Sequence, residues 1–224
     1  MPNWCYFNML VGGRRENVDL FVGILYNGYD QIHMCRINDI DICNTEDYGM
    51  YRRVEICGEC AWSVYCCMFD GPGSYFEDHV RDTVNPPHPR IARHYKLPTG
   101  VTTNIITLSK QLELDISIHS EEPGMCFCEL YHIKNGEVLT EETGKYEELW
   151  IGESDTWDDL VDYYGGPSSV EGFTKDEFDA YKARGERNII HSDFGYNDMI
   201  AIGPGTKPVF ETKQRLYRVL DKDK

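Results

Sequence analysis

Residues 52–69, RRVEICGECAWSVYCCMF, constrain the fold of this chain more than any other stretch. Their even-numbered positions are mostly apolar, which predicts one long strand with period-two alternation. Alternatively, Val54 and Cys57 keep helical spacing, so that a helix ends near Gly58 and a strand begins after it. We favour the second interpretation, because strands longer than about 10 residues are unusual. In both interpretations residues 60–69 form a core strand, and Trp62 is buried on its apolar face.

The composition indicates a folded protein. The 224 residues are 41% hydrophobic and 12% aromatic, enough to bury a sizeable core. Nine cysteines cannot all pair, and the first 13 residues lack the basic start and apolar run of a signal peptide. No apolar run approaches the ~18 residues of a membrane helix. We therefore expect a cytoplasmic protein with free thiols and no membrane partner.

The charge distribution excludes one class of function and suggests another. A formal net charge of −16 argues against direct nucleic-acid binding, which requires a basic surface. Residues 137–179 hold 14 Asp and Glu against two Lys, and seven Tyr, Trp and Phe are interleaved with them. This pattern predicts a folded, acidic and aromatic-rich surface, although most acidic stretches are only solvated faces.

Hydrophobic periodicity outlines the elements of the first 150 residues. Residues 3–11 have apolar groups on both faces, which predicts a central strand, and residues 17–26 form an amphipathic helix. Residues 71–100 contain five prolines and form a long inserted loop. Residues 114–118 alternate as a half-buried strand after a short helix. Two further strands pair over Asn135-Gly136, the strongest short hairpin signal.

The last part of the chain has two helices. Residues 155–164 place their apolar side chains on one stripe, and Gly165 ends the helix. Thr174 and Glu177 form a capping box for the next helix, which runs to Arg184. Short strands are expected at residues 188–192, 199–202 and 209–212.

The order of elements fits an α+β fold in which helices lie on one face of a mainly antiparallel sheet. The opening residues, MPNWCYFNMLVG, resemble the start of the YubB-like ferredoxin-fold family of phages and plasmids. Residues 57–63, CGECAWS, resemble the family's central Trp-Gly-Thr-Lys-Trp-Asp segment but are one residue longer. Residues 103–127 also look like the family's second half.

The resemblance implies a ferredoxin-like domain at residues 1–150, with an insertion at 71–100. It also implies a mobile-element setting without iron–sulfur chemistry, and it carries over no catalytic residue. Residues 151–224 are not covered, and we expect them to form a small α/β extension that is acidic, with helices and short strands.

Four cysteines form the most suggestive group for chemistry. Cys57, Cys60, Cys126 and Cys128 could bind zinc only if the first two flank a turn at Gly58. If Cys57 and Cys60 lie in one strand, their side chains point to opposite faces. Free cysteine is among the most buried residue types, so we favour packing over metal binding. The seven histidines are dispersed and form no motif with a nucleophile. We expect no cofactor and no enzymatic activity.

Three functions remain open at this point. The favoured one is a phage or mobile-element protein that inhibits a host protein with a basic surface, such as a defence nuclease or CRISPR-type effector, by mimicking nucleic acid. The alternatives are a small metal- or cysteine-dependent enzyme and a self-assembling structural protein, the latter a homo-oligomer. For the favoured function, the expected partner-binding residues are Glu147, Glu148, Trp150, Glu153, Asp155, Asp158, Asp159 and Asp162.

Overall fold

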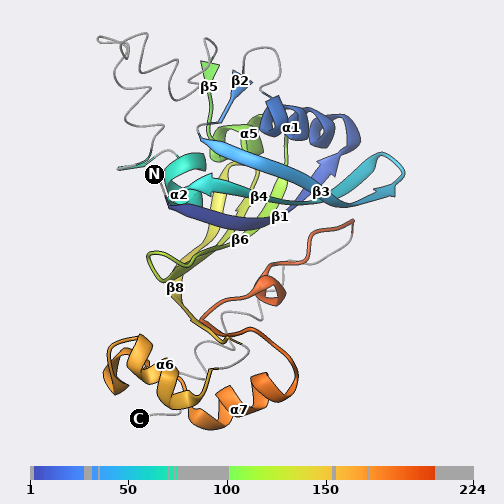
Figure 1. Ribbon diagram of the computed structural model, residues 1–224. Coiled ribbons are helices and arrows are strands. Elements are labelled where there is room, and N and C mark those ends of the chain that lie inside the picture. Colours follow the sequence, from blue (N-terminus) through green and yellow to red (C-terminus); the bar gives the residue numbers. More distant parts are fainter. Residues whose placement is uncertain are drawn as a thin grey trace, which may run out of the picture.

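The computed structural model describes residues 3–27, 32–34, 36–69, 71–72, 74, 101–152, 155–170 and 172–204. Within them the chain forms nine strands and five α-helices (Figure 1). The strands are β1 (Trp4–Arg14), β2 (Ile32–His33), β3 (Ile37–Tyr48), β4 (Tyr51–Ala61), β5 (Val101–Thr102), β6 (Asp115–Glu122), β7 (Phe127–Lys134), β8 (Glu137–Trp150) and β9 (Asn188–Ser192). The helices are α1 (Arg15–Asn27), α2 (Val64–Met68), α5 (Ile105–Gln111), α6 (Trp157–Tyr163) and α7 (Lys175–Ala183).

Seven strands make one antiparallel sheet in the order β3-β4-β1-β6-β7-β8-β9. β1 is hydrogen-bonded to β4 on one side and β6 on the other, which confirms the predicted central strand at residues 3–11. Two-residue strands β2 and β5 pair in parallel in a separate small sheet.

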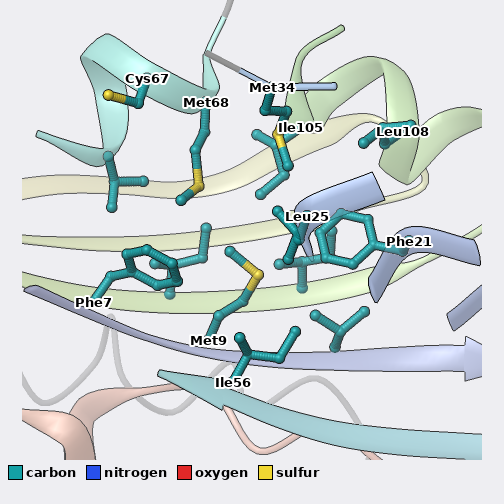
Figure 2. Close-up of a cluster of buried hydrophobic side chains, with 14 of the residues drawn as sticks. Phe7, Met9, Phe21, Leu25, Met34, Ile56, Cys67, Met68, Ile105 and Leu108 are labelled. Carbon is teal, nitrogen blue, oxygen red and sulfur yellow. The ribbon is translucent and has the colours of Figure 1, made fainter. Parts of the chain in front are cut away.

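The main core lies between the sheet and α1, α2 and α5. Phe7 and Met9 of β1 are buried here with Phe21 and Leu25 of α1, and Ile105 of α5 joins them (Figure 2). The apolar stripe expected for residues 17–26 is therefore confirmed, since burying it removes the apolar face of α1 from water.

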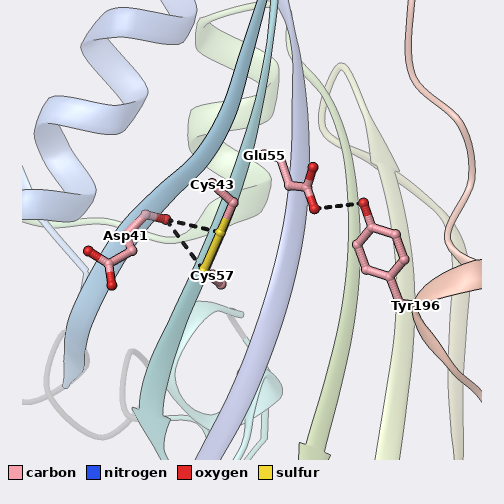
Figure 3. The surroundings of a disulfide bond; sticks show 5 residues. All are labelled: Asp41, Cys43, Glu55, Cys57 and Tyr196. Carbon is pink, nitrogen blue, oxygen red and sulfur yellow. Dashed lines mark hydrogen bonds between the residues drawn. A yellow bond between two sulfur atoms is a disulfide. The ribbon is translucent and has the colours of Figure 1, made fainter.

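The opposite face of the sheet is covered by residues 193–202. Leu10 and Leu130 of the sheet form a small buried cluster with Met199 and Ile202. Polar contacts fix the same segment: the hydroxyl of Tyr196 donates to Glu55 at 2.6 Å (Figure 3). This segment has no strand at residues 199–202, contrary to our expectation, because its backbone crosses the sheet face instead of pairing at an edge.

The expected ferredoxin-like sheet with helices on one face is wrong. The described chain is mostly a curled seven-stranded antiparallel sheet with few helices (Figure 1). The hairpin strands β7 and β8 extend this sheet, and β9 adds to β8 instead of starting a sheet in a separate α/β extension. The architecture therefore depends on pairing between strands that are far apart in sequence. Hydrophobic periodicity within one segment does not predict which strands pair.

The favoured interpretation of residues 52–69 is also wrong. The strand comes first, as β4, and the helix follows, as α2, whose N-terminus is capped by the Ser63 side chain. β4 is stable at 11 residues because β1 and β3 pair with it on both sides. Trp62 lies between the two elements with φ of 74° and is 40% exposed, so it is not the buried core residue we expected.

Local signals in the second half are confirmed. Asn135 and Gly136 connect β7 to β8 with φ of 50° and 82°, the left-handed values that this type of hairpin turn requires. Thr174 and Glu177 form both hydrogen bonds of the capping box of α7. Residues 75–100, which hold most of the expected loop, and the expected strand at 209–212 lie outside the described residues.

Candidate functional site

The predicted partner-binding residues lie in one part of the molecule, residues 146–192, which we call the acidic lobe. α6 and α7 lie beyond the end of β8 (Figure 1). The end of β8, together with β9, packs against these helices around a second hydrophobic cluster. Leu149 and Ile189 supply the sheet side of this cluster, and Leu160 and Phe178 supply the helix side. Because the apolar side chains turn inward, the carboxylates between them are left on the surface.

Two of the predicted carboxylates have structural roles. Asp159 accepts hydrogen bonds from the backbone N–H and the hydroxyl of Thr156, and these bonds lower the pKa of Asp159. Asp155 accepts from the backbone N–H of Gly152 at 2.7 Å, and it precedes α6 instead of lying within it. Both residues therefore shape the entry to α6, a role that their acidic character alone does not reveal.

Two others are free for a partner. Asp158 and Asp162 lie one turn apart on α6, and both are exposed. Neither side chain makes a hydrogen bond or an ion pair with another residue of the described chain. Tyr163 beside them is 84% exposed, and Trp150 at the end of β8 is 60% exposed. Exposed aromatics of this size are typical of binding surfaces.

A cleft of about 1050 Å³ opens beside β8 and β9 and includes two more predicted residues, Glu147 and Glu148. Glu148 accepts a hydrogen bond from the Asn188 side chain. Glu147 is half-buried, and its side chain makes no hydrogen bond or ion pair within the described residues. Glu153 lies outside the part of the chain that the structure describes.

One wall of the cleft is aromatic. The rings of Phe173 and His191 stack with their centroids 4.5 Å apart. The imidazole Nε2 of His191 lies 3.1 Å from a carboxylate oxygen of Glu177, and the pKa of Glu177 is lowered, first by the Thr174 hydroxyl and also by His191. The sequence does not reveal the pairing of Phe173 with His191, because Phe173 precedes α7 and His191 lies on β9, and the two meet only in the folded chain.

Negative charge accumulates on the neighbouring strands. The pKa of Glu121, at the end of β6, is raised by burial and by the nearby Glu148. The pKa of Tyr146 is raised by burial and by the same two carboxylates. Burial is the larger cause of both shifts, and the contribution of the neighbouring carboxylates shows that they interact with each other and with Tyr146.

The four cysteines considered for zinc do not come together. Cys57 and Cys60 both lie on β4 with side chains on opposite faces, Cys60 in the core and Cys57 in a disulfide with Cys43 (Figure 3). Cys126 is exposed, and Cys128 is buried. Six described cysteines have free thiols, as expected, whereas Cys43 and Cys57 are joined in a disulfide that the sequence did not lead us to expect. No group of three His, Cys, Asp or Glu arranged for a metal ion occurs among the described residues.

Helices long and apolar enough to span a bilayer are absent from the described part of the chain. Comparison with known proteins adds no function to this geometry, and the resemblance to the YubB-like family stays a prediction. No protein-family model, no curated protein and no solved structure matches this chain.

Proposed function

We propose that this chain is an acidic interaction protein, encoded by a phage or mobile element, that binds a basic surface of a host protein in the cytoplasm and inhibits it. The target class is a nucleic-acid-binding defence protein, a nuclease or a CRISPR-type effector. The chain acts by occupying the surface that the target uses for nucleic acid, and it performs no catalysis itself. The mobile-element origin rests on the resemblance of residues 1–150.

The observation that carries this proposal is the set of carboxylates that folding does not use. The side chains of Asp158, Asp162 and Glu147 have no partner in the described chain, and Asp162 is next in sequence to Tyr163, which is 84% exposed. Duplex DNA presents about one charge per 1.7 Å of its axis, so a protein that replaces it must present dense, accessible negative charge. The aromatic rings next to the carboxylates supply the apolar contact that charge alone lacks.

The placement of Asp162 supports a binding role over a structural one. It lies in the last turn of α6, where the helix dipole disfavours a carboxylate. It also lies four residues after Asp158, and like charges at this spacing cost a helix a few tenths of a kcal/mol. A basic partner relieves both penalties, and electrostatic steering speeds its approach in a salt-dependent manner.

The test reverses the two free carboxylates with Asp158→Lys and Asp162→Lys and uses the intact chain as bait in host lysate. A matched control, Glu137→Lys with Glu141→Lys, changes the net charge equally at exposed positions of β8 outside the acidic lobe. We expect the first variant to lose the captured protein and the control to keep it. The first variant should stay folded, because neither side chain makes a hydrogen bond in the described chain.

The captured protein is then tested for duplex DNA binding in the presence of the chain. The proposal predicts competition that weakens with salt. Capture by the Asp158/Asp162 variant equal to that of the wild type at low salt would refute the role of this surface. Simultaneous binding of DNA and the chain to the target would refute mimicry.

A further inference from the structure

β9 is an open edge of the main sheet. It is hydrogen-bonded to β8 and to no other strand of the described chain. The Asp193 N–H donates to the Lys145 carbonyl at 3.0 Å, and the Ile151 N–H donates to the Arg187 carbonyl at 2.7 Å. Along an edge strand, the backbone N–H and C=O groups of successive residues point alternately toward and away from the neighbouring strand. The two bonds show that the odd-numbered residues of β9 point these groups toward β8. The N–H and C=O of Ile190 therefore point outward, away from the sheet.

In the part of the chain that the structure describes, β9 lacks the sequence features that usually protect an edge strand. Proteins block exposed edges with lysine, proline, bulges or a covering segment. β9, with the sequence NIIHS, contains neither lysine nor proline, and its pairing with β8 has no bulge. Ile190 is 42% exposed. The edge is thus able to accept another strand.

The residues around this edge favour an added strand that carries positive charge. Residues 190–193 line the cleft of about 1050 Å³ together with Glu147 and Glu148. With Asp193, the lining holds three carboxylates against one lysine, Lys145. Glu147, which lies directly opposite His191 in the β8–β9 ladder, is the carboxylate without a partner in the described residues. Side chains on one face of an added strand would reach this carboxylate.

We propose that the edge of β9 and its cleft bind an extended, Lys- or Arg-rich segment of the partner as an additional antiparallel or parallel strand. Main-chain hydrogen bonds to β9 supply part of the affinity, and alternate basic side chains enter the cleft beside Glu147. This inference rests on the proposed function, because it specifies how a basic partner is held. A second copy of the chain is a poorer occupant, since each copy carries a net charge of −16.

The test measures binding of a fluorescently labelled octapeptide, with alternating Lys and Val, to the full chain by fluorescence anisotropy at several salt concentrations. Ile190→Pro removes the outward N–H and leaves the bonds to β8 in place, because proline is tolerated at an edge position whose N–H faces solvent. We expect it to weaken peptide binding at least tenfold, whereas the matched control Ile190→Val keeps it. Glu147→Gln is expected to weaken binding and to reduce its dependence on salt.

Hydrogen exchange separates an added strand from simple charge attraction. The His191 amide, which bonds to β8, should be protected with and without peptide and in the Ile190→Pro variant, which shows that β9 is still paired. The Ile190 amide should become protected only when the wild type binds the peptide. Peptide bound without protection of Ile190, or bound equally by Ile190→Pro, would overturn the inference.

The two proposals fail separately. If Asp158→Lys with Asp162→Lys abolishes partner capture while Ile190→Pro binds the peptide as the wild type does, the proposed function stands and the edge inference falls. If the chain instead forms concentration-dependent dimers that Ile190→Pro abolishes, the occupant is a second copy and the basic-strand inference is wrong.

Discussion

Glu129 is the most informative position for testing the physical account of this fold. Glu129 is 3% exposed, and its side chain lies on the core side of β7. It accepts hydrogen bonds from the Ser120 hydroxyl at 2.7 Å, the Tyr131 hydroxyl at 2.8 Å and the Val64 backbone N–H at 2.9 Å. The last bond anchors the N-terminus of α2 to the sheet, so Glu129 joins three separate parts of the core.

The magnitude of the Glu129→Ala effect follows from these three donors. A buried donor left without an acceptor costs about 1–3 kcal/mol, so three give roughly 3–9 kcal/mol. A cleft of about 360 Å³, lined by Glu129 and Tyr131, lets water reach part of the network. We therefore expect a loss near the lower end, about 3 kcal/mol of unfolding free energy. Glu129→Gln keeps one oxygen acceptor, and the Tyr131 hydroxyl can rotate to accept from the new amide, so its cost at pH 7 is about 1 kcal/mol or less.

The pH dependence supplies a second, independent prediction. The pKa of Glu129 is raised above its ordinary value of 4.5, mainly by burial, while the hydrogen bonds oppose this shift. In the window between 4.5 and the raised pKa, the folded chain binds the proton more readily than the unfolded chain does. The contribution of Glu129 to stability is therefore present below pH 4.5 and is lost as the pH rises through the folded pKa. The glutamine variant cannot show this change.

Both effects are measured by urea unfolding of the wild type and the two variants from pH 4 to pH 8. The difference in unfolding free energy between the wild type and Glu129→Gln cancels the titration of groups that the two proteins share. This difference should decrease as the pH rises. A difference that increases with pH would show that the hydrogen bonds outweigh burial and lower the pKa of Glu129. An alanine variant as stable as the glutamine variant would show that the carboxylate does not hold the three donors together.

Two further predictions concern covalent and backbone constraints. Replacing Cys43 and Cys57 by serine removes a disulfide that joins residues 14 apart in sequence, and it should lower the unfolding free energy by about 3 kcal/mol on the chain-entropy model. Reductant should likewise lower the urea midpoint of the wild type. A double-serine variant with the same urea midpoint as the oxidised wild type would contradict the prediction. Gly136→Ala should destabilise the β7–β8 hairpin by more than about 1 kcal/mol, because φ is 82° and a Cβ would lie 2.6 Å from the Lys110 Cβ; an unchanged thermal midpoint would refute it.

The sequence by itself determined the features that depend on neighbouring residues. Asn135-Gly136 specified a hairpin because few other residues adopt left-handed φ at both turn positions. Thr174 and Glu177 specified the start of α7, since both hydrogen bonds of a capping box close within four residues. The apolar stripe of α1 and the concentration of acid in residues 137–179 were also visible, because periodicity and charge are properties of the chain alone.

Only the tertiary structure decided how residues 52–69 fold and which acidic residues are free. The alternation in residues 52–61 fits a strand, but an 11-residue strand is stable only because β1 and β3, which lie far away along the chain, satisfy its hydrogen bonds on both sides. The same holds for the carboxylates of the acidic lobe. Asp158 and Asp159 are adjacent and chemically identical, yet the turn before α6 binds Asp159 to Thr156 and leaves Asp158 to solvent. The sequence gives the number of these carboxylates, whereas the backbone geometry determines which of them are available to a partner.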